Sequence, residues 1–162
     1  MPPLELTLRL LLAAGFGAAI GLEREYRRKP AGLRTNILIA LGSALFTMMS
    51  MRLGLAGHNE DRISSTVVSG IGFLGAGAIM RHRESVTGMT TAATIWVNAA
   101  VGMAVGAGEY AMASLATLIT LLVLAALAPA ERYFERRASS PAAANAASSS
   151  APDGPPAPTR RQ

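Results

Sequence analysis

The sequence predicts an all-α protein, a polytopic membrane bundle of about five transmembrane helices, and two observations carry this prediction. Hydrophobic residues make up 51% of the 162 residues and charged residues only 15%, whereas soluble domains carry about 25% charged residues. The apolar residues also form long runs without polar alternation, each near the ~20 residues that span a bilayer. These runs are residues 6–22, 37–55, 63–80, 91–108 and 110–129. Soluble helices of this kind in series would leave almost no polar face for water.

The first run is expected to be a retained helix. A cleaved signal peptide would begin with a positively charged segment, and none precedes this run, which leads directly into Glu23-Arg24-Glu25. Glu5 and Arg9 stand four positions apart, in the order that favours an ion pair on one helix face. Residues 1–137 are therefore expected to form one transmembrane domain.

The Lys and Arg residues of the loops predict the orientation in the membrane, because cytoplasmic loops carry an excess of them. They gather in the first loop, in the third loop and after the fifth run: Arg24, Arg27, Arg28, Lys29, Arg34; Arg81, Arg83; Arg132, Arg136, Arg137. The N-terminus is therefore expected outside and the C-terminus inside, although Arg9 and Arg52 oppose this bias weakly. Orientation explains most of the net charge of +5. No basic stripe is interleaved with aromatic residues, so nucleic acid is not an expected partner.

Residues 138–162 are rich in Ala, Ser and Pro and differ sharply from the rest of the chain. Repeated prolines prevent a regular helix there. We expect a disordered cytoplasmic tail that is simply solvated, with partner binding as the less favoured alternative.

The glycines predict close helix packing. Gly70 to Gly75 match the spacing G-x-G-x-x-G, but the motif lies inside an apolar run, so a dinucleotide site is rejected. Small residues at such spacings let helix backbones approach closely in lipid, which predicts a tight bundle, a homo-oligomer, or both. The candidate packing residues are Gly17, Gly21, Gly70, Gly72, Gly75, Gly77, Gly102 and Gly106.

Polar residues near the ends of the runs form a candidate functional cluster on the cytoplasmic side. Its members are Glu23, Arg24, Arg34, Thr35, Thr90 and Thr91. Glu23 and Arg27 are spaced for an ion pair, and Pro30 stops any continuation of the first helix. Thr35 is expected to cap the second helix, and Thr90 or Thr91 the fourth. The alternative interpretation is an interfacial anchor whose arginines face lipid headgroups.

Neither a metal site nor catalysis is expected. The chain has no cysteine, which excludes thiolate ligands and a Cys nucleophile. Glu23 and Glu25 point to nearly opposite sides of a helix, and His58 and His82 lie on opposite faces of the membrane. No Ser/His/Asp set is assembled by spacing, and no cofactor is expected.

Four stretches together resemble the membrane domain of the MgtC/SapB family of bacterial inner-membrane proteins. They are residues 20–25 (IGLERE), 31–36 (AGLRTN), 68–77 (VSGIGFLGAG) and 86–96 (VTGMTTAATIW). The resemblance covers roughly residues 7–128 and implies a multi-spanning protein linked to magnesium limitation and virulence. It further implies action on other membrane machinery, including the ATP synthase. Members such as MgtC carry a soluble C-terminal domain, whereas this chain is expected to have only the membrane domain and the tail.

Two positions depart from the family pattern. The family commonly has Asp-Pro-x-Arg before the third helix, and counting back from Arg62 places Asn59 at the Asp position. Asp61 could replace the missing aspartate of the motif, but its side chain would point in a different direction. Asn59, Asp61 and Arg62 therefore form a candidate polar group on the outer face. Thr66 stands where the family frequently has Gln.

The favoured function is that of a non-enzymatic regulator of other membrane proteins. The alternative is a transporter or channel component for magnesium, another ion or a small solute. Transport sites usually contain ionisable residues within the membrane, and the middles of these runs contain none. A membrane enzyme is the least favoured class.

Reporter fusions test the predicted orientation. Fusions within residues 81–90 and after residue 138 are expected to score as cytoplasmic, and fusions at residues 57–59 as periplasmic, because loop charge sets orientation. A periplasmic C-terminal fusion would overturn both the helix count and the assignment of sides.

Overall fold

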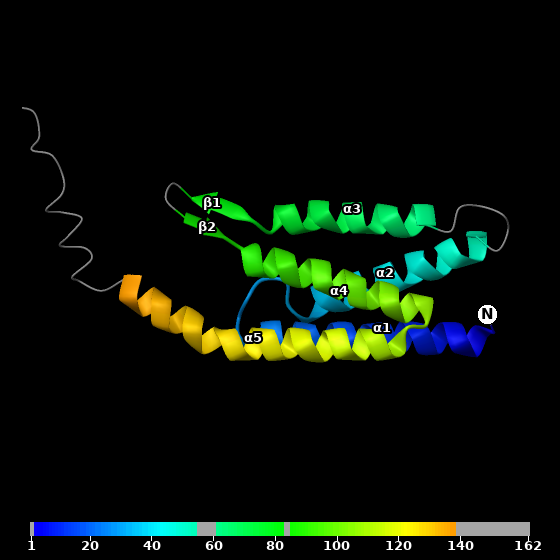
Figure 1. Cartoon of the computed structure of the whole chain (residues 1–162), viewed down its shortest axis with the longest axis horizontal. Helices are drawn as coiled ribbons and strands as arrows, with labels where there is room; N and C mark the ends of the chain where they lie inside the picture. The colour runs from blue at the N-terminus through cyan, green and yellow to red at the C-terminus, as the bar shows by residue number, and fades with distance from the viewer. Residues whose placement is uncertain (1, 55–60, 83–84, 139–162) are drawn as a thin grey trace, which may run out of the picture. The chain divides into compact units, whose positions relative to one another are not determined.

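The computed structural model describes residues 2–54, 61–82 and 85–138, and these form five helices and one short hairpin (Figure 1). The all-α prediction is confirmed. Four helices are long and apolar enough to cross a membrane, while the apolar part of the remaining one, Ser65–Gly77, is shorter. In chain order the elements are α1 Pro3–Tyr26, α2 Leu33–Gly54, α3 Asp61–Gly77, β1 Met80–His82, β2 Ser85–Thr87, α4 Met89–Ala107 and α5 Tyr110–Ala138.

The hairpin corrects the predicted end of the third run. Helix α3 ends at Gly77, and Met80 pairs with Thr87 in an antiparallel β1–β2 ladder. Gly88 then turns the chain into α4 with φ +87°, and a Cβ there would collide with the carbonyl oxygen of Ala78. Only glycine fits this turn without strain. Three-residue strands are too short to show alternation in the sequence.

The chain divides into two compact units, residues 1–124 and 125–162. The first unit contains α1 to α4, the hairpin and the first half of α5. The described part of the second unit is the rest of α5. The tail predicted from residue 138 lies, apart from its first residue, outside the described residues.

Helix α2 lies between α1 and α4, and both neighbours approach its backbone through glycines. A Cβ on Gly17 of α1 would lie 2.7 Å from the carbonyl oxygen of Asn36 and 2.9 Å from the Cβ of Ala40. A Cβ on Gly102 of α4 would lie 2.9 Å from the Cα of Ala40. Both crossings therefore leave no room for a side chain, and Ala40 is enclosed from two sides.

The same contact repeats one turn further along each neighbouring helix. A Cβ on Gly21 would lie 2.7 Å from the Cα of Leu33, and one on Gly106 would lie 2.6 Å from the carbonyl oxygen of Ala44. Close backbone approach gains dispersion contacts, which drive helix association where the hydrophobic effect is absent.

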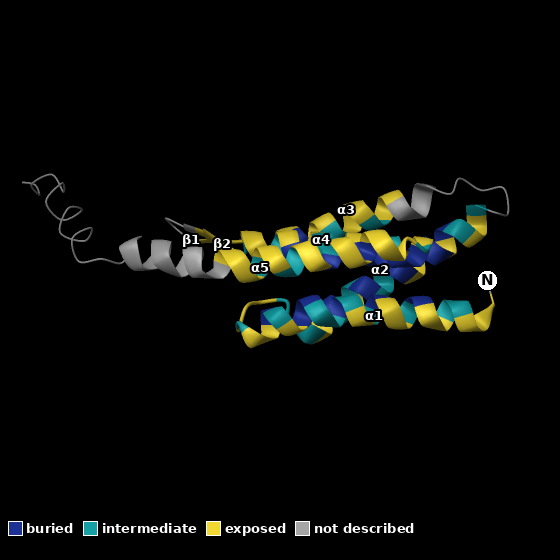
Figure 2. Ribbon diagram, turned by 60° about the horizontal axis from the view of Figure 1, so that its bottom comes forward, coloured by how far each residue is buried: buried dark blue, intermediate teal, exposed yellow. Residues whose placement is uncertain are grey.

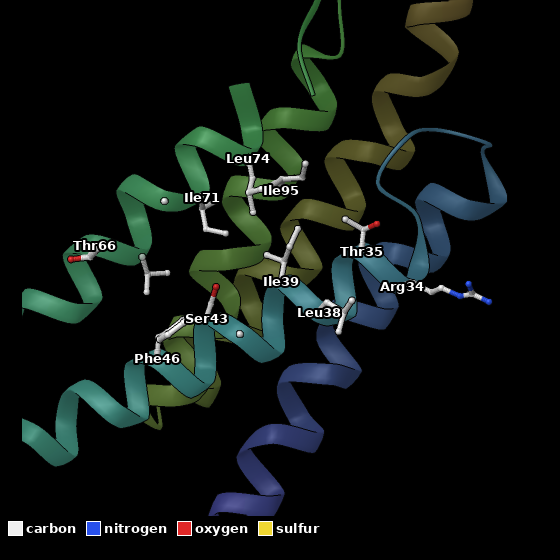
Figure 3. A pocket seen from close by; sticks show the side chains of 13 residues that line it. Arg34, Thr35, Leu38, Ile39, Ser43, Phe46, Thr66, Ile71, Leu74 and Ile95 are labelled. Atoms are coloured by element: carbon white, nitrogen blue, oxygen red, sulfur yellow. The ribbon is translucent and has the colours of Figure 1, made fainter. Parts of the chain in front are cut away.

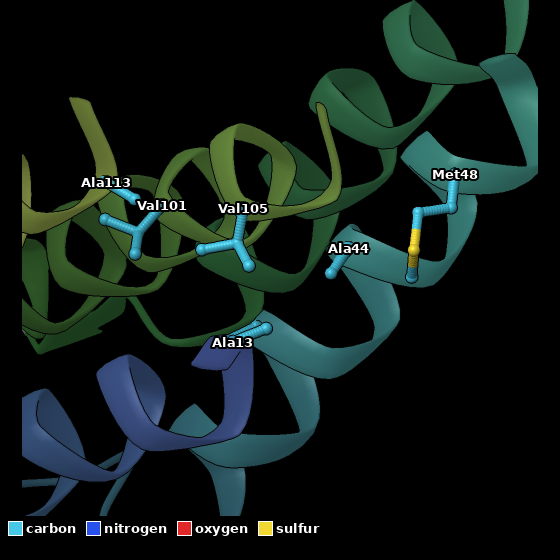
Figure 4. Packing of buried hydrophobic residues seen from close by; sticks show 7 residues of the cluster. Ala13, Ala44, Met48, Val101, Val105 and Ala113 are labelled. Atoms are coloured by element: carbon cyan, nitrogen blue, oxygen red, sulfur yellow. The ribbon is translucent and has the colours of Figure 1, made fainter. Parts of the chain in front are cut away.

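Small side chains make up most of the core, and many large apolar side chains are exposed. Figure 2 shows that the buried positions gather where the helices face one another and that exposed positions cover the outer faces. Leu11, Leu38, Phe73, Trp96 and Leu118 are each more than half exposed. This distribution suits a protein whose solvent is lipid, because large exposed apolar areas are rare on soluble monomers. The buried hydrophobic cluster shown in Figure 4 comprises Ala13, Ala40, Ala44, Met48, Val101, Val105 and Ala113.

The glycines of α3 behave differently from those of α1 and α4. A Cβ on Gly70, Gly72 or Gly77 would meet nothing within 4 Å among the described residues, and one on Gly75 would make an ordinary 3.7 Å contact with the Cβ of Ala92. Within the described part of the chain, these three glycines therefore do not form a close helix crossing.

Gly17→Ala and Gly15→Ala form a matched pair that tests the α1–α2 crossing. Each adds one methyl group to α1, but a Cβ on Gly15 meets nothing within 4 Å. Alanine alone favours helix by about 1 kcal/mol, so Gly15→Ala is expected to keep or raise the thermal unfolding midpoint in mild detergent. Gly17→Ala is expected to lower it, since overpacking costs about 1–3 kcal/mol. Equal midpoints for the two variants would contradict the crossing.

Candidate functional site

The C-terminal turn of α1 and the first turn of α4 meet through a buried polar contact. Arg24 is only 3% exposed, and its Nη2 donates a hydrogen bond of 2.8 Å to Oγ1 of Thr91, which is also buried. The cation lies in the last turn of α1, where the helix dipole favours positive charge. The structure thus brings together two members of the predicted cluster that are 67 positions apart.

Glu23 pairs with Arg27, one helical turn further along, which confirms the predicted ion pair. The Glu23 and Arg27 side chains are 13% and 25% exposed. Both carboxylate oxygens of Glu23 are buried, and neither accepts a hydrogen bond from the described residues. Removal of either side chain would leave the other charge partly buried without its partner, which is destabilising.

Glu25 has a role that the sequence did not indicate. Its Oε2 accepts a 3.1 Å hydrogen bond from the backbone N–H of Leu33, the first residue of α2. Asn36 completes this end of α2 by donating from Nδ2 to the carbonyl oxygens of Ala31 and Gly32. A carboxylate from the preceding helix therefore satisfies a free donor of α2.

The predicted threonine caps are wrong. Helix α2 begins at Leu33, so Thr35 lies inside its first turn. Helix α4 follows the left-handed Gly88, which makes no side-chain cap, so Thr90 and Thr91 also lie inside the helix. At α2 the carboxylate of Glu25, in the preceding helix, replaces the local cap that spacing suggested. At α4 a glycine turn replaces it.

The remaining members of the predicted cluster are separate from the Arg24–Thr91 contact. Thr90 is exposed, and its carbonyl oxygen accepts a 2.7 Å hydrogen bond from Oγ1 of Thr94. Arg34 and Thr35 are exposed and line one end of a groove between α2, α3 and α4 (Figure 3). The six predicted residues therefore lie near the same ends of the helices, and the Arg24–Thr91 hydrogen bond joins two of them directly.

A pair of buried asparagines links α2 to the middle of α4. Nδ2 of Asn98 donates to the backbone oxygen of Asn36 at 2.7 Å and to its Oδ1 at 3.1 Å. Both residues are fully buried. Hydrogen bonds between helices in lipid contribute about 0.6–2 kcal/mol. The pair therefore fixes the register of the two helices around Ala40.

Arg9 holds the other ends of α1 and α4 together. It is 8% exposed, and it donates from Nη1 to the carbonyl oxygen of Gly106 and from Nη2 to Glu5. The predicted Glu5–Arg9 pair is confirmed. The positive charge faces the C-terminal end of α4, where the helix dipole is negative. The loop charges predict that this end of α1 faces the outside, where a positive charge is unexpected. The contact with Gly106 explains why an arginine is present there.

The other site predictions lie at the edge of the described structure. Asn59 is outside the described residues, and for Asp61 and Arg62 only the helical backbone of α3 is described. Among described residues, no group of at least three His, Asp or Glu side chains is arranged to hold a metal ion.

The long apolar helices, the small core and the outward-facing large residues define a polytopic α-helical membrane protein. The profile of the MgtC family matches residues 10–133, and the chain belongs to this family. The chain is 46% identical over 127 residues to a putative magnesium transporter, YhiD, of Escherichia coli K12, covering 74% of this chain and 59% of that protein. It is 48% identical over 114 residues to the protein MgtC of Salmonella typhimurium LT2, covering 70% of this chain and 48% of that protein.

A third relative is an uncharacterized protein of Synechocystis, 41% identical over 135 residues, or 82% of this chain and 56% of that protein. No solved structure matches the chain. The chain spans about half to three fifths of the length of these relatives. The part of the chain that matches the family, residues 10–133, includes the Arg24–Thr91 and Asn36–Asn98 contacts.

Thr91→Val and Thr90→Val test the buried polar contact. Thr91→Val keeps the volume but removes the acceptor of Arg24, and a hydrogen bond to a charged group is worth about 1.5–3 kcal/mol. Denaturant titration in mixed micelles should show a loss of that size in unfolding free energy. Thr90→Val, at an exposed neighbouring position, should change it by less than about 0.5 kcal/mol. Equal losses in both variants would show that the Arg24–Thr91 hydrogen bond does not stabilise the fold.

Proposed function

We propose that this protein is a non-enzymatic regulator of other membrane proteins in the bacterial inner membrane, linked to magnesium homeostasis, low-magnesium adaptation or virulence. Membership of the MgtC family supports the link to magnesium, as do the relatives named MgtC and putative magnesium transporter. The partners proposed from the family resemblance are other membrane proteins, such as the ATP synthase, and further copies of the chain.

One observation carries the preference for regulation over transport. The interface of α1, α2 and α4 is closed by backbone contact, because a single methyl group on Gly17, Gly21, Gly102 or Gly106 would already collide with α2. A hydrated ion cannot pass where a methyl group does not fit. The described charged side chains that are buried, Arg9 and Arg24, lie near the ends of α1 and bind α4.

The other polar side chains that are buried in the described bundle are uncharged. Asn36 and Asn98 bond to each other, and Thr47 and Thr94 donate to carbonyl oxygens one turn earlier in their own helices. Transport sites in membranes usually rely on ionisable residues facing a cavity. The interface of α1, α2 and α4 offers packing and register instead.

The arginine-rich end offers a surface for a partner. The Arg24–Thr91 contact ties α1 to α4, and the Glu23–Arg27 pair lies beside Arg24 in sequence with its carboxylate oxygens buried. The rigid planar fork of arginine cannot be replaced by lysine where it is buried and hydrogen-bonded. We therefore place the regulatory surface at this end of α1 and α4, which Glu23 and the buried Arg24 and Thr91 hold in shape.

Growth rescue combined with a flux assay tests the proposal. In a strain lacking the gene, the wild-type protein is expected to restore growth in low magnesium. Arg24→Lys is expected to lose at least half of that rescue at equal membrane abundance. The control Arg28→Lys, at an exposed position just after α1, is expected to rescue fully.

Purified protein in proteoliposomes is expected to give no magnesium flux above empty vesicles. Magnesium flux that requires the protein would favour the alternative, a transporter or channel component. Full rescue by Arg24→Lys would contradict the proposed regulatory surface and would show that Arg24 has only a structural role.

A further inference from the structure

A groove of about 770 Å³ lies between α2, α3 and α4 (Figure 3). Its volume falls within the range of about 300–1,000 Å³ that is usual for ligand sites. Gly42 of α2 and Gly70 of α3 line it, and a Cβ on either would meet nothing within 4 Å. The groove therefore has free space beside both glycines.

The lining is apolar along most of its length. Side chains from all three helices contribute, and Ser43 and Thr66 are polar exceptions in the half of the groove that is remote from Arg34. The apolar lining residues are Leu38, Ile39, Phe46, Val67, Ile71, Leu74 and Ile95. Such a lining suits a hydrocarbon chain.

The length of the groove matches one leaflet of a bilayer. It extends along α2 from Arg34 to Phe46, which is about 18 Å at 1.5 Å per helical residue. One half of a hydrocarbon core of ~30 Å is ~15 Å, whereas a partner helix crossing the bilayer would need its full thickness. The dimensions therefore favour a lipid chain over a transmembrane helix.

The end of the groove at the start of α2 is polar and positively charged. Arg34 and Thr35 line it, and both are exposed. In Figure 3 the Arg34 side chain extends outward from the start of α2. Long cationic side chains near helix ends reach toward lipid headgroups in this way, and anionic headgroups attract them.

We propose that this groove binds one anionic phospholipid from the leaflet at the arginine-rich end. Its phosphate contacts Arg34 and Thr35, and an acyl chain lies along the apolar lining as far as Phe46. The lipid covers a face of α2, α3 and α4 that side chains of the described chain leave open. This site is distinct from the Arg24–Thr91 contact and does not depend on the proposed regulatory function.

Native mass spectrometry of the full chain in detergent tests the proposal. Phosphatidylglycerol and phosphatidylcholine with identical acyl chains serve as probes. The wild-type protein is expected to retain one phosphatidylglycerol at least fivefold more than phosphatidylcholine. Arg34→Gln is expected to abolish this preference, and the control Arg28→Gln, also exposed, to keep it.

A second pair of variants tests the apolar part. Gly70→Leu fills the groove and is expected to reduce retention of both lipids at least fivefold. Gly72→Leu, on the same helix but not lining the groove, is expected to bind as the wild type does. Equal retention by Gly70→Leu and Gly72→Leu would overturn the proposal. So would the loss of a protein dimer in Gly70→Leu without any change in bound lipid, because a second copy would then be the occupant.

Discussion

The rest of the structure depends on the direct backbone contact of α2 with α1 and α4 around Ala40. Gly17 and Gly102 enclose this residue from two sides, and neither position has room for a Cβ. Because lipid is as apolar as leucine, the bundle gains nothing by burying large side chains, and close contact of backbones takes their place. This explains why alanine and valine dominate the core while leucine and phenylalanine face outward.

Polar contacts then fix which helix faces meet. The Asn36–Asn98 pair sets the register of α2 and α4, because an alternative register would leave the buried Nδ2 group of Asn98 without its acceptors. Arg24 with Thr91 and Arg9 with Gly106 join α1 to α4 at opposite ends. Two buried arginines thus hold α1 against α4. The proposed regulatory surface therefore lies on a rigid part of the bundle.

Much of this fold could be predicted from the sequence, because the length of an apolar run and the spacing of its glycines can be read within a single helix. The Glu5–Arg9 and Glu23–Arg27 pairs are one helical turn apart, so spacing alone predicts them. Contacts between different helices could not be predicted in this way. Neither the cap that Glu25 makes on α2 nor the separation of Arg34 from Arg24 has a local signal, and spacing could not tell the enclosed Gly17 from the open Gly72.

Solid-state NMR of the protein in lipid bilayers, labelled with ¹³C at alanine and glycine, tests the central contact most directly. The structure predicts through-space correlations from the methyl group of Ala40 to the backbone carbons of both Gly17 and Gly102. Their absence, in spectra that show the correlations expected within each helix, would contradict the packing of α1 and α4 on α2.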